Sequence, residues 1–434
     1  MSVTVVPLDD PWAFTAPKSG FVADGAAVRP AAWGIFRDRD GVAHPWSVNE
    51  CNLLFWEGKP FLPFGGMINS RATWASNTGE PGGDFLDAGL RMVEEQFKLL
   101  KKYGVDEVYF NGFFLRSNPN YMRKLVALTE KYGMKYGLEV TSVPEHSGKG
   151  FVRNKVDRIP LKGGETAVTV ETSTAYPTDK KPKGSDRTRY DAPHRCLWVL
   201  LDAAGNPLET GMGVLQPGKE ETAGVTPLSL AVKFRKAAPA GAVLAYLPEV
   251  TLSRSDPAGY LEGLSDYIAK LRAVYGSLRF GPNLRFFIDP LQNEMHFQSE
   301  AVPTGAEFRR RYAEFLLNRY GSATALGRAW GVAQPLSALA VAARLVPLWE
   351  ENGASLWIDP ETGTECRMAT KNASTALRDL KEFRGRLCME LISQLSDELK
   401  RLADVPVLVK HNIWFSDWFV NPEKQGGFDG IGMR

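Results

Sequence analysis

The chain has 434 residues, of which 44% are apolar, 24% charged and 11% aromatic, and its net charge is +2. This length suits one large domain with a smaller one, or two to three average domains. Because both signs of charge are interspersed, without a basic block or an acidic tail, the composition argues against a nucleic-acid partner.

The first segment, residues 1–57, is interrupted by proline and glycine and shows no helical period. Its amino-terminal residues, MSVTVVPLDDPW, lack a charged region followed by an apolar one, and no apolar run in the chain approaches the ~20 residues of a membrane helix. We therefore expect a cytoplasmic protein without a membrane partner. Secretion stays open as an alternative if the natural N-terminus is longer.

Strands and helices alternate in the next segment, residues 58–150, after two short strands at 53–56 and 61–64. Asp84 can cap a helix that ends at Gly104, and Asn118-Pro119 opens a second helix that ends at Gly133. The predicted strands of the alternation are 61–67, 105–110 and 135–141. This alternation is typical of βα units on a parallel sheet.

Residues 151–254 change character, because they contain β-type segments and no amphipathic helix. The segments are AVTVETS, RCLWVLLDA, LSLAVKF and AVLAYLPEV, separated by glycine and proline turns. They predict an antiparallel, sandwich-like β domain inserted after the third strand.

The alternation returns in residues 255–434. Helices are predicted at 255–275, 304–320, 322–330 and 373–402. Thr304 and Glu307 are predicted to form a capping box at the start of the second of these helices. Strands are predicted at 284–288, 405–409 and 428–433. A stretch rich in tryptophan and proline, residues 332–372, is expected to cover the mouth of the fold.

Together these segments predict an α/β fold of the TIM (β/α)8-barrel type with an inserted antiparallel β domain. The barrel is incomplete, because only six of its strands are found. Since an open barrel would leave a strand edge exposed, we expect either a fragment or strands supplied by another chain. A homo-oligomer is one way to supply them.

The candidate catalytic residue is Glu294, which with Asn293 lies just past the strand 284–288. Active sites of barrels form at the carboxyl ends of the strands. Glycoside hydrolysis needs one carboxylic acid to protonate the leaving oxygen and a second carboxylate to attack or to activate water. Asn293 is placed to hold the sugar 2-hydroxyl. The alternative is that Glu294 is an ordinary surface carboxylate.

Further candidates for binding a sugar lie near the same strand ends. They are Asn111 after the second strand, His296 beside Glu294, and His411, Asn412 and Trp414 after the fifth strand. For each of them a structural role in a loop or in the core is an equal alternative. Lys410 could form a Schiff base with a carbonyl substrate, although a solvated lysine is the plainer interpretation.

The cysteines and histidines show no pattern of a metal site. Cys51, Cys196, Cys366 and Cys388 are far apart and form no C-x-x-C pair, which favours reduced thiols. The five histidines are scattered without the spacing of metal ligands. Because the sequence also lacks the glycine motifs that bind nucleotides, we predict no metal and no other cofactor.

Three stretches resemble a known family. They are GKPFLPFGGM (58–67), FRRRYAEFLLNRYGSATALGRAWG (308–331), and the strand VPVLVKHN (405–412) followed by FDGIG (428–432). With Asn-Glu after the fourth strand, the chain resembles the clan of retaining (β/α)8-barrel glycoside hydrolases, and within it the family 42 β-galactosidases. The resemblance implies an oligo- or polysaccharide substrate, a β-linked and perhaps galactosidic bond, and a retaining mechanism with Glu294 as acid/base.

The resemblance also implies a nucleophile that this sequence does not supply. In the family it is a glutamate at the end of the seventh strand, which would lie beyond Arg434. Other carboxylates lack the strand-end context of a nucleophile; these are Glu139, Glu145, Glu350, Glu351 and Asp359. The β insertion departs from the family pattern as well.

Two other functions are therefore kept. The first is a catalytically inactive protein that binds carbohydrate, or serves assembly, through the β insertion or the aromatic residues. The second is a lyase or aldolase that uses Lys410.

Overall fold

The computed structural model describes residues 30–49, 53–62, 65–68, 83–110, 119–140, 148–152, 156–175, 194–218, 225–252, 256–291, 301–333, 335–350, 354–368, 375–411 and 430–433. The chain divides into two compact units. Unit 1 comprises Met1–Ser142, Ile268–Glu294 and Met389–Arg434, and unit 2 comprises Val143–Tyr267 and Met295–Cys388. Each unit is described by itself, and the predicted boundaries near residues 57, 150 and 254 stay predictions.

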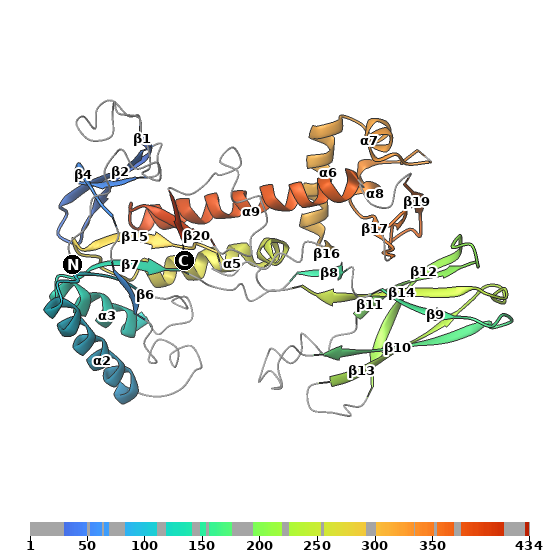
Figure 1. The fold of residues 1–434 in the computed structure, drawn as a ribbon, viewed down its shortest axis with the longest axis horizontal. Coiled ribbons are helices and arrows are strands. Elements are labelled where there is room, and N and C mark those ends of the chain that lie inside the picture. The colour runs from blue at the N-terminus through green and yellow to red at the C-terminus, as the bar shows by residue number, and fades with distance from the viewer. Residues whose placement is uncertain are drawn as a thin grey trace, which may run out of the picture. The chain divides into compact units, whose positions relative to one another are not determined.

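The main feature of unit 1 is a six-stranded sheet in the order β21-β20-β15-β7-β6-β5 (Figure 1). Its strands are β5 Gly66–Ile68, β6 Glu107–Phe110, β7 Lys135–Glu139, β15 Leu284–Ile288, β20 Val407–His411 and β21 Gly430–Met433. Every neighbouring pair is parallel. All five residues of β15 are buried, as expected for a parallel strand that is covered on both faces.

Helices α2 Gly83–Lys102 and α3 Pro119–Lys131 connect the first three of these strands. Gly104 and Gly133 follow them with φ of 75° and 57°, the left-handed conformation that glycine adopts without a steric penalty and that ends a helix. Phe97 of α2 is fully buried and packs edge-on against Phe110 of β6. The apolar face of α2 therefore lies on the sheet, as its sequence period predicts.

The prediction of a TIM barrel is wrong. The six segments predicted as barrel strands do form parallel strands in chain order, but β5 and β21 lie at the two ends of the sheet, and no pairing between them is found in the described part of the chain. Closing a sheet requires enough strands, with the tilt and stagger that bring the first beside the last. Local alternation of strands and helices predicts parallel pairing, but it does not predict whether the first and last strands pair to close the sheet.

Unit 1 also contains a small antiparallel sheet of β1 Pro30–Arg37, β2 Ala43–Asn49, β3 Leu54–Trp56 and β4 Lys59–Pro60. The sequence analysis predicted a short strand at β3 and missed β1 and β2. The sheet is held to the rest of unit 1 by Asp404, whose backbone oxygen accepts a hydrogen bond from Trp46 Nε1 at 2.6 Å. The guanidinium of Arg285 in β15 lies over the ring of Trp56, 4.6 Å from its centroid.

Unit 2 contains an eight-stranded antiparallel sheet (Figure 1). Its strands are β8 Lys149–Val152, β9 Asp157–Pro160, β10 Ala167–Ala175, β11 His194–Leu201, β12 Pro207–Pro217, β13 Val225–Lys233, β14 Val243–Thr251 and β16 Ala301–Pro303. The four β segments predicted from the sequence are β10, β11, β13 and β14. The glycine-containing β12 was missed, because PLETGMGVLQP has no clear alternation.

The second part of unit 2 is largely helical. It contains α6 Ala306–Tyr320, α7 Ala323–Trp330, α8 Leu339–Ala342, and a small sheet of β17 Val346–Pro347, β18 Leu356–Ile358 and β19 Glu365–Arg367. The rings of Phe308 and Tyr312 in α6 each lie 5.1 Å from that of Phe383 in α9. Helices α5 Pro257–Tyr275 and α9 Thr375–Leu402 each begin in unit 2 and end in unit 1.

A buried ion pair joins three elements of unit 2. Arg384 of α9 donates a hydrogen bond to the carboxylate of Asp256, and its Nη1 donates to the carbonyl oxygen of Ala301 in β16 at 3.0 Å. The second oxygen of Asp256 accepts from the backbone N–H of Ala258, at the start of α5, at 3.0 Å. The side chain of Arg384 is only 3% exposed and that of Asp256 is fully buried.

We predict that Arg384→Met lowers the free energy of unfolding by about 3–5 kcal/mol, because it leaves the Asp256 charge buried without its partner. Urea denaturation measures this loss, and the double variant with Asp256→Asn should recover part of it. Arg386→Met is the matched control, since this exposed side chain pairs with Glu382 on the helix surface and its loss should cost about 0.5 kcal/mol or less. Equal effects at the two positions would contradict the prediction.

Candidate functional site

The predicted catalytic residue lies outside the described residues, as do five of the six predicted binding residues. These are Asn293, Glu294, His296, Asn111, Asn412 and Trp414. Lys410 and His411 are the last two residues of β20, and only their backbone is described. The structure describes the strands that lead to each of these positions.

These strands end at one edge of the parallel sheet. Phe110 of β6 is in register with Leu138 of β7, Glu139 is in register with Ile288 of β15, and Leu408 of β20 is in register with Ile288 on the other side. Asn111 directly follows β6, and Glu294 follows β15 by six residues. The sheet therefore brings the carboxyl ends of β6, β7, β15 and β20 to the same edge.

Two buried carboxylates lie at this edge within the described residues. Glu139 is the last residue of β7 and is fully buried, and Asp289, which directly follows β15, is 3% exposed. Asp289 has a φ of 49°, a conformation that is uncommon outside glycine and often found at functional positions. Burial and the nearby charge of Glu139 raise the pKa of the Tyr275 hydroxyl far above its ordinary value. Tyr275 therefore stays protonated beside Glu139.

Glu139 was predicted near the end of the strand 135–141 but without the strand-end context of a nucleophile. The structure corrects this point, since β7 ends at Glu139. The available signal was a single acidic residue within the otherwise apolar run YGLEV. Asp289 gave a similar signal by following directly on the apolar strand LRFFI.

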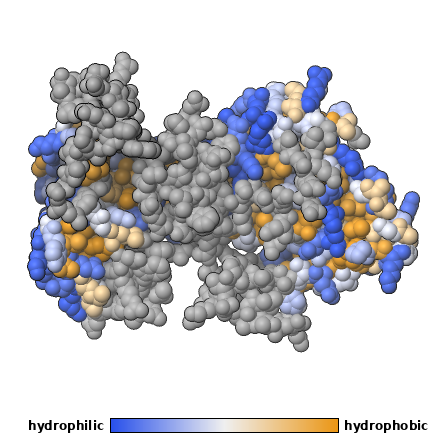
Figure 2. Space-filling model, in the orientation of Figure 1, coloured by the Kyte–Doolittle hydropathy of each residue, from blue (hydrophilic) through white to orange (hydrophobic). Residues whose placement is uncertain are grey.

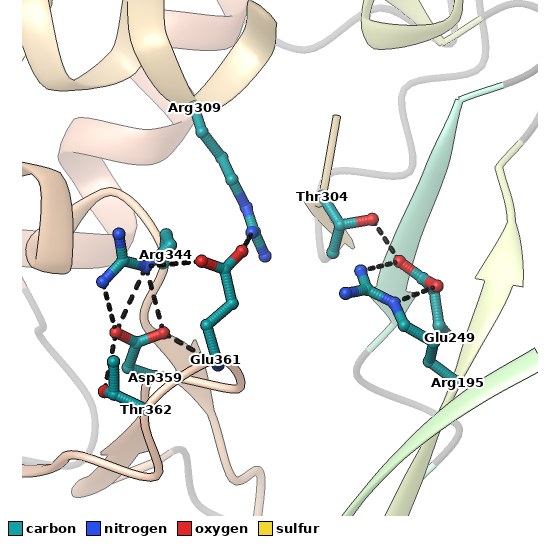
Figure 3. Close-up of polar contacts among 8 residues, drawn as sticks. All are labelled: Arg195, Glu249, Thr304, Arg309, Arg344, Asp359, Glu361 and Thr362. Carbon is teal, nitrogen blue, oxygen red and sulfur yellow. Dashed lines mark hydrogen bonds and ion pairs between the residues drawn. The ribbon is translucent and has the colours of Figure 1, made fainter. Parts of the chain in front are cut away.

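A second polar cluster lies in unit 2 and is centred on Glu249 of β14 (Figure 3). Arg195 of β11 donates to both oxygens of this carboxylate, from Nε at 2.9 Å and from Nη2 at 2.6 Å, and Thr304 donates its hydroxyl to it. Burial acts to raise the pKa of Glu249, but the hydrogen bonds from Arg195 and Thr304 outweigh it and lower the pKa. The carboxylate is thus held ionised.

This contact corrects the predicted capping box. Helix α6 begins after Gly305, which provides no side-chain cap, and Thr304 bonds Glu249 instead. Glu307, the expected second member of the box, pairs with Arg310 and Arg311. A charged acceptor close in space competes successfully with the local backbone amide, because charge-assisted hydrogen bonds are the stronger ones.

Three further charged residues of the cluster are joined through Glu361. Arg344 donates to Asp359 from Nη2 at 2.7 Å and lies with its Nε 3.4 Å from Glu361, while Arg309 of α6 donates from Nη1 to the same glutamate. Asp359 is fully buried and also accepts from the hydroxyl of Thr362 at 2.9 Å. Figure 3 shows the groups around Glu361 and around Glu249 within one view.

A cavity of about 820 Å³ in unit 2 lies between β12 and the loop before β19. Its lining includes Leu208, Thr210 and Met212 on one side and Glu361, Thr362 and Glu365 on the other. Leu208 and Val214 of β12 are among the exposed large hydrophobic residues, and Figure 2 shows apolar patches interspersed with hydrophilic ones on the face that it draws. Walls with both hydrogen-bonding groups and apolar area suit a ligand with hydroxyl groups and C–H faces.

The described residues contain no group of three or more His, Cys, Asp or Glu side chains placed to hold a metal ion. Cys196 and Cys366 are buried, and burial raises the pKa of these thiols to about 12 and about 11. Such thiols are protonated at neutral pH and are poor nucleophiles. Among the helices within the described ranges, none has the length and apolar character needed to span a lipid bilayer.

Comparison with known proteins finds no family model that matches the chain and no curated protein with significant sequence similarity. The resemblance to retaining glycoside hydrolases therefore stays a prediction, which depends on the three sequence stretches alone.

We predict that the stabilisation provided by Glu249 is lost in acid. The pKa of Glu249 lies below the ordinary pKa of 4.5 for a glutamate, so its ionised form stabilises the fold fully at pH values above 4.5. This stabilisation disappears as the pH falls through the lowered pKa of the folded state. At pH 7, Glu249→Gln should unfold more easily than the unmodified protein by about 1–3 kcal/mol. Urea denaturation at pH 3 should show a smaller difference in the free energy of unfolding between the variant and the unmodified protein. A difference of the same size at both pH values would contradict the prediction. Glu314→Gln, at an exposed position of α6, should show little difference at either pH.

Proposed function

We propose that the protein hydrolyses a β-linked, galactoside-like carbohydrate, with Glu294 as the acid/base at the carboxyl edge of the parallel sheet. The observation that carries this proposal is the position of β15, which is buried at every residue, lies between two parallel neighbours and ends five residues before Asn293 in the sequence. In α/β folds, the loops at the carboxyl ends of parallel strands carry binding and catalytic residues. The proposal therefore does not need a closed barrel.

Glu294 acts twice in a retaining mechanism. As an acid it protonates the glycosidic oxygen while a second carboxylate attacks the anomeric carbon, and the sugar becomes covalently bound to that carboxylate. As a base it then removes a proton from the water that hydrolyses this intermediate. Asn293 holds the sugar 2-hydroxyl, through a hydrogen bond that tightens in the transition state.

We propose Glu139 as the second carboxylate. It ends β7, the direct neighbour of β15, and it is fully buried at the same edge of the sheet. Its chemistry as a carboxylate fits either the nucleophile of a retaining enzyme or the base that activates water in an inverting one.

Glu294→Gln should lower kcat for a p-nitrophenyl β-galactoside or a related β-linked aryl glycoside by about 10²–10⁴-fold, because it removes the general acid/base. Binding of the substrate should persist. If Glu294 is the acid/base of a retaining enzyme, Glu294→Ala should regain turnover in azide and release a β-glycosyl azide, since azide needs no base to attack the intermediate. Unchanged turnover in Glu294→Gln would overturn the assignment.

Glu139→Ala tests the second carboxylate separately. We expect loss of turnover and, if Glu139 is the nucleophile, an α-glycosyl azide when azide replaces it, because attack then occurs directly on the substrate. The matched control is Glu107→Ala, at the amino end of the neighbouring strand β6, which should keep its activity. Circular dichroism of each variant establishes that it is folded. Normal hydrolysis by folded Glu139→Ala would exclude this role.

A second function, carbohydrate binding without hydrolysis, is favoured by the cavity beside β12 in unit 2. The two functions are separated by the unmodified protein itself. A binding protein retains the sugar and releases no p-nitrophenol, whereas a hydrolase releases it at a rate that falls in the Glu294 variants.

A further inference from the structure

Arg309 of α6 has two buried hydrogen-bond donors without an acceptor. Its side chain is 10% exposed, and only Nη1 is engaged, by Glu361. Nε and Nη2 are buried and have no hydrogen-bond partner in the part of the chain that the structure describes. Burial lowers the pKa of this guanidinium, whereas Glu361 and Asp359 act to raise it. Buried charged donors without an acceptor are costly, by about 1–3 kcal/mol or more.

The two donors form one edge of the guanidinium. Nε and Nη2 point in parallel, and this is the edge that binds both oxygens of a carboxylate or phosphate at once. Arg195 uses the corresponding edge in this way toward Glu249, at 2.9 and 2.6 Å. The edge of Arg309 therefore has the geometry of a carboxylate site whose acceptor is not part of the described protein.

Arg195 supplies a third donor nearby. Its Nε and Nη2 are bound to Glu249, whereas no hydrogen bond of its Nη1 is found among the described residues. The charges of Arg195 and Arg309 interact with each other and with Glu361. In Figure 3 the free tip of Arg195 is turned to the side of Arg309.

The carboxylates of the cluster are already in use. Glu249 is held by Arg195 and Thr304, Asp359 is held by Arg344, and Glu361 accepts from Arg309 and lies beside Arg344. Three guanidiniums and three carboxylates are therefore present in this part of unit 2. Arg195 and Glu361 have side chains that are 41% and 45% exposed, so this side of the cluster is open to solvent.

We propose that Arg309 and Arg195 of unit 2 bind the carboxylate group of a small ligand. Arg309 takes both oxygens through Nε and Nη2, and Arg195 contributes Nη1. This site is separate from Glu294 and Glu139, and it does not depend on the proposed hydrolysis. It gives unit 2 a recognition function for acidic compounds, of which a sugar acid is one example.

Isothermal titration and thermal unfolding of the full chain test this site with sodium acetate and sodium glucuronate, at constant ionic strength set by sodium chloride. Glucose is the neutral counterpart of glucuronate. Binding to the folded state alone raises Tm with ligand concentration. We expect saturable binding of the carboxylates and no comparable binding of glucose.

Arg309→Lys keeps the positive charge and removes the two-donor edge, and we expect it to weaken binding at least about tenfold, the equivalent of one charge-assisted hydrogen bond. Arg195→Lys should weaken binding as well. It replaces Arg309→Lys as the test of the site if Arg309→Lys does not fold. Arg310→Lys is the matched control, because this neighbouring side chain is exposed and pairs with Glu307 and Glu314. The proposal is wrong if the unmodified protein binds neither carboxylate, if glucose binds equally, or if folded Arg309→Lys binds as tightly as the unmodified protein.

Discussion

The backbone pairing of β15 on both of its edges is the constraint on which the proposed catalytic site depends. Parallel strands bury their polar backbone groups only by bonding a neighbour on each side. For β15 and the residues flanking it, the hydrogen bonds with the two neighbouring segments include Tyr136 N to Asn283 O, Val140 N to Ile288 O, Phe287 N to Pro406 O and Asp289 N to Leu408 O. These bonds fix the register, so the chain leaves β15 at the same edge where β7 ends with Glu139.

Buried charges play two different parts in unit 2. The carboxylate of Asp256 is held by Arg384 and by a backbone amide at the start of α5, and this arrangement fixes three elements of the fold. Arg309 differs, because two donors of its guanidinium remain without an acceptor among the described residues. A pairing that joins elements stabilises the fold, whereas a buried guanidinium edge with both of its donors unsatisfied is where we propose a bound carboxylate. This difference separates a structural arginine from one that we assign to binding.

Much of the secondary structure was predictable, since it follows from local patterns. The spacing of apolar residues predicted α2, α3, α6 and α9, and glycines marked where several helices end, as Gly321 does with a φ of 73°. Where a pattern was weak, as in β12, the prediction failed. The capping box failed for another reason: Thr304 met Glu249, a residue 55 positions away in the sequence. No local pattern contains such a contact.

The sequence by itself determined the order of strands and helices along the parallel sheet, four of the inserted β segments and the apolar strand that precedes Asn293-Glu294, because hydrophobic period and turn residues act over short distances. Only the tertiary structure decided that the parallel sheet stays open, since closure depends on strands far apart in the chain. The tertiary structure likewise decided the surroundings of Glu139 and Arg309. Which buried charges lack an acceptor is a property of packing, and the linear sequence does not contain it.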